Sequence, residues 1–100
     1  MTAPLLTTSR TVFRIIFDDA WDRTEKLAQL DPQWPLPQQI RRELEFMKQC
    51  IARPGGPTEQ DAARVDIGVL AVRNFDENDP EYSNWLQELD YAFKRWHDLP

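Results

Sequence analysis

The chain has 100 residues, the usual size of a single domain. Its 17 acidic against 12 basic residues give a net charge of −5, which argues against non-specific nucleic-acid binding and against anionic membranes, because both need clustered lysine and arginine. One cysteine excludes an internal disulfide, and one cysteine with one histidine is too small a ligand set for zinc.

The first helix is expected over residues 9–30, after a flexible lead-in over residues 1–8, with Thr8 or Ser9 as its cap. The lead-in has no apolar run long enough for a secretory signal, so we expect a cytoplasmic protein. Apolar residues cover nearly half of the circumference of this helix, more than one core contact needs. This width indicates two helix neighbours, or one core face and one partner face.

The second helix is expected over residues 37–53, after a stiff connector that contains three prolines. Within the connector, Trp34 either covers the core or stacks on a ligand, and we expect it to cover the core. The helix carries a narrow core-facing seam at steps of four, three and four residues, formed by Ile40, Leu44, Met47 and Ile51. Cys50 has no base or basic neighbour assigned to it by the sequence, so we expect it to pack in the core.

The third helix is expected over residues 59–74, with Thr58 as its cap and Asp61 in a capping-box position. Between residues 65 and 72 only Asp66 is polar, which predicts a helix buried on all sides. Gly68 lowers helix stability by about 1 kcal/mol relative to alanine, so we expect it to permit a close approach of two helices. A strand over residues 67–72 is the alternative, but no other segment offers it a partner strand.

The fourth helix is expected over residues 80–97, because Asp79-Pro80-Glu81 combines a cap, a proline at the first position and an acid at the positive end of the helix dipole. Its aromatic and aliphatic stripe leaves Tyr91 on the opposite side. The sequence therefore predicts an all-α fold, a compact antiparallel four-helix bundle forming a single domain over residues 1–100.

We find no pattern that predicts a catalytic, cofactor or metal site. His97 lacks an orienting partner for general-base chemistry. We expect it to be a cation near the negative end of the helix dipole. The run 76–79 lacks the glycine and the distal glutamate of a calcium loop. Abundant paired carboxylates leave a small hydrolytic enzyme as a third hypothesis, which would require a concave pocket.

The acidic turn between the last two helices is the candidate recognition feature. It is held between two helices, so it can present its acids rigidly, and the alternative is that Asp79 caps the helix while Asp76 and Glu77 only solvate the turn. We expect Asp79 to be structural. The candidate partner-binding residues fall in two acidic groups: Asp76, Glu77 and Glu81 at the turn, and Asp18, Asp19 and Asp22 on the first helix.

One pattern resembles a known family. It comprises an apolar helix containing Gly68, then Ala71-Val72-Arg73-x-Phe75-Asp76-x-x-Asp79-Pro80-Glu81, then leucines at Leu86 and Leu89. It is similar to a family of small helical immunity proteins of bacterial type VI secretion systems, and the second-helix run 42–48 extends the likeness. The best-known member of that family neutralises an effector that hydrolyses NAD and NADP.

The resemblance implies a cytoplasmic, non-enzymatic protein that binds a cognate effector toxin and occludes its active site. The toxin is expected to hydrolyse NAD(P)+ or to act on related nucleotides. The alternative function is a helical adaptor or a homodimeric regulatory module, because the wide apolar face of the first helix is compatible with a homodimer.

Overall fold

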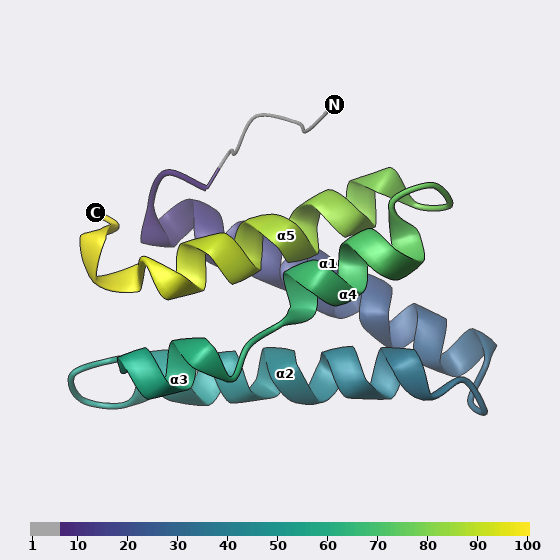
Figure 1. Cartoon of the computed structure of the whole chain (residues 1–100), viewed down its shortest axis with the longest axis horizontal. Helices are drawn as coiled ribbons and strands as arrows, with labels where there is room; N and C mark the ends of the chain where they lie inside the picture. Colours follow the sequence, from purple (N-terminus) through teal and green to yellow (C-terminus); the bar gives the residue numbers. More distant parts are fainter. Residues whose placement is uncertain (1–6) are drawn as a thin grey trace.

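Every regular element in residues 7–100, the part of the chain that the structure describes, is helical. The structure is a computed structural model (Figure 1). Its elements in chain order are α1 (Arg10–Leu30), α2 (Pro35–Ala52), α3 (Glu59–Ala63), α4 (Ile67–Phe75), α5 (Pro80–Lys94) and the 3-10 helix η1 (Trp96–Asp98). The all-α prediction is confirmed. Residues 1–6 of the expected lead-in lie outside the described residues, and the Thr7 N–H donates to Glu88 Oε1 over 3.2 Å.

The helices begin at residues suited to helix starts. Ser9 Oγ accepts from the Val12 N–H over 3.1 Å at the start of α1. Thr58 and Asp61 form both hydrogen bonds of the predicted capping box at the start of α3. Asp79 Oδ1 accepts from the Tyr82 N–H over 3.2 Å at the start of α5, as expected for a structural cap.

The four α-helices of nine or more residues in the described chain, α1, α2, α4 and α5, form one domain, with α3 as a single short turn of helix. Helices α1 and α5 are antiparallel: the Arg10 N–H donates to the Pro100 carbonyl over 2.9 Å at one end, and Arg23 pairs with Asp79 over 2.6 Å near the other. In Figure 1, α4 and α5 lie on the near side of α1, while α2 runs along the lower edge beside α3.

The core takes side chains from both ends of the chain and from the middle. Ile40, Leu44 and Met47 are fully buried, which confirms the seam predicted for α2, and Ile51 is half-buried at its end. The stripe of α5 and η1 packs against them with Tyr82, Leu86, Leu89, Phe93 and Trp96. Burial raises the pKa of Tyr82 to about 12, so its hydroxyl stays protonated beside Thr24 Oγ1, 2.6 Å away.

The prediction of a single helix over residues 59–74 is wrong, because the helix is interrupted at residues 64–66, between α3 and α4. Side chains of other helices bind the backbone at and beside this break. The Asp66 N–H donates to Glu43 Oε1 of α2 over 2.8 Å, and Lys94 Nζ of α5 donates to the Val65 carbonyl over 3.1 Å. These tertiary contacts satisfy polar groups that a continuous helix would pair internally. The boundaries of the other helices differ from expectation by up to three residues, and η1 continues the chain after α5.

The prediction that residues 65–72 are buried on all sides is also wrong. Ile67, Ala71 and Phe75 face the core at steps of four residues, but Val69 is 49% exposed and Val72 is 50% exposed. The reason is geometric: α4 packs mainly against α5, and so small a bundle has no further layer to cover its outer side. Two apolar residues of α4 therefore face solvent.

Two local predictions about packing are confirmed. A Cβ atom added at Gly68 would lie 3.0 Å from Asp90 Oδ2 and 3.2 Å from Asp90 Cβ, so a larger residue here would push Asp90 away, and glycine allows the close approach of α4 to α5. The Trp34 ring packs on Phe75 with 5.8 Å between ring centroids, so it covers the core where the connector crosses it.

Candidate partner-binding surface

The acidic turn carries three exposed carboxylates, Asp76, Glu77 and Glu81. Asp76 lies directly after α4 in helical geometry, with φ −57° and ψ −33°, and its Oδ1 accepts from Ser83 Oγ over 3.3 Å. The Asp79 N–H donates to the Phe75 carbonyl over 2.8 Å. The turn is therefore held at both ends by hydrogen bonds.

Arg23 of α1 fixes the start of α5 from the side. Its Nη1 lies 2.6 Å from Asp79 Oδ2, its Nη2 lies 3.2 Å from Glu81 Oε1, and its guanidinium lies over the Trp85 ring at 5.1 Å. The hydrogen bond to Asp79 raises the pKa of Arg23, so the guanidinium stays charged. Glu81 is partly neutralised by this contact, whereas Asp76 and Glu77 form no ion pair with a residue of 7–100.

The second acidic group, Asp18, Asp19 and Asp22, lies on exposed positions of α1. None of the three takes part in an ion pair within residues 7–100. Asp18 borders a hollow of about 300 Å³ between α1 and α2, and the contact of α1 with the acidic turn is made by Arg23 instead. The two acidic groups therefore belong to different elements, this one to α1 and that of the acidic turn to the end of α4 and the start of α5.

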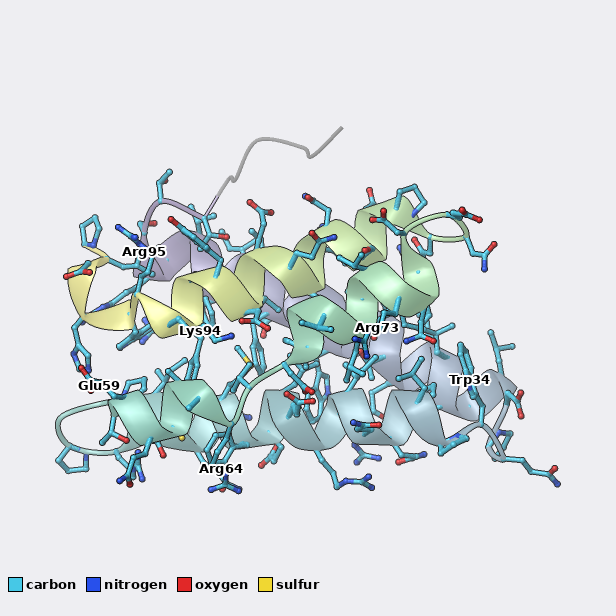
Figure 2. All side chains as sticks on the ribbon, in the orientation of Figure 1. Trp34, Glu59, Arg64, Arg73, Lys94 and Arg95 are labelled. Carbon is cyan, nitrogen blue, oxygen red and sulfur yellow. The ribbon has the colours of Figure 1, made fainter. Side chains whose placement is uncertain are left out.

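A third surface, which the sequence analysis missed, lies between α4 and α5. It is a hollow of about 520 Å³, open to solvent, and we call it the α4–α5 hollow; its lining is Gly68, Val69, Val72, Arg73, Gln87, Asp90, Tyr91 and Lys94. Its apolar side chains stand out from the surface, because Val69, Val72 and Tyr91 are each about half exposed. Arg73 and Lys94 are labelled on its border in Figure 2.

Some of the charged residues around the α4–α5 hollow form ion pairs, and others do not. Asp90 is buried; its Oδ1 lies 2.6 Å from Lys94 Nζ, and its Oδ2 accepts from the Gly68 N–H over 2.8 Å. Arg95 lies over the Tyr91 ring at 5.3 Å, and Arg73 forms no ion pair with any residue of 7–100. Within the hollow Lys94 and Asp90 therefore pair with each other, and Arg73 is the lining cation that forms no ion pair with a described residue.

The α4–α5 hollow is continuous with the acidic turn. Val69, Val72, Arg73 and Asp76 follow one another at helical steps of three, one and three residues, so they lie along one side of α4. On α5, Gln87 Nε2 donates to Ser83 Oγ over 3.0 Å, and Ser83 Oγ donates to Asp76 Oδ1. One signal in the sequence pointed here: Tyr91 lies off the core-facing stripe of its helix.

Cys50 and His97 serve the fold. Cys50 is buried, and burial raises the pKa of its thiol, which keeps it protonated and unreactive. His97 Nε2 lies 2.6 Å from the Pro57 carbonyl, so the ring ties the end of the chain to the loop before α3. Among residues 7–100, no helix combines the length and apolar character that crossing a bilayer demands.

Comparison with known proteins gives one match. The model of the family described as Tsi6 matches residues 14–95, which run from the first turns of α1 to the end of α5. No curated protein and no solved structure matches the chain.

Proposed function

This chain belongs to the Tsi6 family of type VI secretion immunity proteins, and from this we propose that it binds and neutralises a cognate effector toxin. The observation that carries the proposal is the extent of the match, which includes every helix from α1 to α5. An immunity protein acts by binding, so the proposal assigns no enzymatic step to this chain, and it places the protein in the cytoplasm, where the toxin acts.

We propose that inhibition works by occlusion of the toxin's active site, with Asp76 and Glu77 in contact with the toxin. Enzymes that act on phosphate-bearing nucleotides use cations and N–H donors to hold the phosphates. A rigid acidic protrusion complements such a cleft, and the hydrogen bonds of the turn supply the rigidity. Complementary charge also raises the association rate.

We further propose that the toxin hydrolyses NAD(P)+ or acts on a related nucleotide, which the family resemblance and this charge argument support. An enzyme that hydrolyses NAD(P)+, or one that acts on a related nucleotide, has the phosphate-binding cleft that the acidic turn fits. Glu81 is a secondary contact in this proposal, because Arg23 already engages it. Asp18, Asp19 and Asp22 form a second candidate contact, separate from the turn.

The test is co-expression of this protein with the toxic domain encoded beside its gene. We expect growth to be rescued and the two proteins to purify as a complex. The purified complex is then assayed for hydrolysis of NAD+ and NADP+, and we expect activity to fall in proportion to bound immunity protein. Failure to form any complex with that domain would contradict the proposal.

A second candidate function is a homodimeric or adaptor module. The half-exposed side chains Val69, Val72 and Tyr91 favour it, because exposed apolar clusters also occur where two copies of a protein associate. Light scattering on the free protein separates the two functions. A tight dimer without affinity for the toxin domain is the result expected of the module.

A further inference from the structure

We propose that the α4–α5 hollow is the apolar centre of the toxin-binding surface, and that it receives a toxin segment whose apolar side chains are flanked by carboxylates. This inference rests on the proposed function and names the chemistry of the contact. It adds apolar and basic residues to a binding surface that would be purely anionic if the acidic turn were its whole extent.

The first argument is the exposure of the three apolar side chains. Val69, Val72 and Tyr91 are 49%, 50% and 47% exposed and border one hollow. Valine is a poor choice for exposed helix positions, because its branched side chain loses rotamer freedom there and gains no burial. Clustered exposure of this kind marks a protein-binding surface, and the family supplies a protein partner.

The second argument is the charge at the rim, which selects the partner's chemistry. The one carboxylate of the hollow, Asp90, is already satisfied by Lys94 and the Gly68 N–H. Arg73 has no ionic partner in residues 7–100, and Arg95, beside the lining residue Tyr91, lies over the face of that ring. A guanidinium presents a planar fork that matches a carboxylate. The segment that fits here is therefore acidic beside its apolar anchor.

The third argument is continuity. The exposed side of α4 leads from Val69 through Val72 and Arg73 to Asp76, so the apolar centre adjoins the acidic turn without a gap in the helix. An apolar centre with a polar rim is the usual anatomy of a protein interface. Because Arg73 at the rim is basic and Asp76 and Glu77 at the turn are acidic, the charges favour one orientation of the bound toxin.

The experiment measures the affinity of the full-length protein for the toxin domain encoded beside its gene, by titration calorimetry. The double variant Val69→Ser/Val72→Ser should bind roughly 10- to 100-fold more weakly, because it removes the apolar anchor site. Arg73→Glu should weaken binding about three- to tenfold, with a larger effect at low salt. Arg73 has no ionic partner to lose, so this variant tests the proposal even if the double variant folds poorly.

Two matched controls separate these effects from general surface changes. Leu30→Ser removes an apolar side chain that is 82% exposed at the end of α1, and Arg42→Glu reverses an exposed charge on α2. Both should leave the affinity within about twofold. Circular dichroism checks that every variant keeps its helix content.

The outcomes distinguish this inference from the proposed function. If the unaltered protein does not bind the toxin domain, both fail. If it binds, and Asp76→Lys/Glu77→Lys weakens the complex while the hollow variants match the controls, the inference alone is overturned. If the free protein sediments as a dimer, and Val69→Ser/Val72→Ser gives a monomer with unchanged toxin affinity, a second copy occupies the hollow and the inference is again overturned.

Discussion

Two hollows in the described part of the chain, the one between α1 and α2 and the α4–α5 hollow, differ in how far their apolar side chains are exposed. The hollow between α1 and α2 has a floor made by Phe13 and Phe17, which are 2% and 9% exposed, so its apolar atoms already belong to the core. In the α4–α5 hollow, Val69 and Val72 project into solvent at about half exposure. Both hollows have charged rims.

This difference separates packing from recognition. A depression floored by buried rings forms wherever two helices diverge, and it offers a partner little surface that is not already covered. Apolar side chains that stand out from a helix offer area that only a partner can bury, at about 25 cal/mol per Å² of area removed from water. On the α4–α5 side, residues that hold the two helices together therefore lie next to residues that can bind a partner.

The largest expected effect is at the closest approach of α4 and α5. Gly68→Val should lower the free energy of unfolding by about 2–3 kcal/mol, because its side chain would collide with Asp90. Urea denaturation measures the change. Ala52→Val, at an exposed position of α2, should cost only about 0.5 kcal/mol, and equal losses at the two sites would show that the α4–α5 contact is no tighter than an open surface.

The next effect concerns the buried carboxylate below the hollow. Asp90→Ala should lower the free energy of unfolding by about 2 kcal/mol, since the Gly68 N–H loses its acceptor and Lys94 Nζ loses its ion pair and keeps the Val65 carbonyl. Asp90→Asn keeps one acceptor oxygen and should cost clearly less. If both variants unfold at the same urea concentration as the unaltered protein, Asp90 does not hold α4 to α5.

A third prediction compares the two acidic surfaces directly. Asp76→Lys/Glu77→Lys should weaken toxin binding about tenfold, which is about 1.4 kcal/mol, with a melting temperature nearly unchanged. Asp18→Lys/Asp22→Lys reverses the same number of charges on α1, where Asp18 borders the other hollow, and should weaken binding about twofold. Calorimetric titration of both variants decides the comparison. A loss on α1 as large as that at the turn would place the α1–α2 hollow inside the interface as well.

The last prediction is a pH dependence of stability at the break before α4. Burial raises the pKa of Glu43 to about 7, with the neighbouring Asp66 as a further cause. Near neutral pH the folded state then binds more protons at Glu43 than the unfolded chain does. The contribution of Glu43 to the free energy of unfolding is fully present below about pH 4.5 and is lost as the pH rises through 7.

Glu43→Gln should remove this slope, because the amide oxygen can still accept from the Asp66 N–H but does not titrate. Urea midpoints at pH 5 and pH 8 measure the difference. Glu45→Gln, at an exposed position of the same helix, is the matched control and should keep the slope of the unaltered protein. A slope that persists in Glu43→Gln would assign it to another group.

Local signals in the sequence were enough to predict the starts of several helices. The Asp79-Pro80 start, the Thr58 capping box and the seam of α2 depend on residues within a few positions of one another, and the structure has all three. The break at residues 64–66 could not be predicted in this way. It depends on Glu43 and Lys94, which are more than 20 residues away in the chain.

The α4–α5 hollow could not be predicted from the sequence for a related physical reason. A continuous apolar run has no polar side to mark which residues face solvent, so burial on all sides and half exposure give the same pattern for Val69 and Val72. The extent of the neighbouring layers decides between them, and that is a property of the whole bundle. The acidic residues were easier to place at the surface, because a buried carboxylate needs a partner and Asp76 and Glu77 are exposed.

The contact between Arg10 and Pro100 has a topological consequence. The Arg10 N–H reaches the Pro100 carbonyl over 2.9 Å, and the Arg10 guanidinium donates to the Trp96 carbonyl, so the start of α1 adjoins the last residue of the chain. A short linker can close this seam, and the connector at Pro32 can be opened instead, which gives a circular permutant with the same helices in the order α2 to α5 and then α1. Neither the new linker nor the cut at Pro32 changes the α4–α5 hollow or the acidic turn. The binding surface should therefore be indifferent to the order in which the helices are joined.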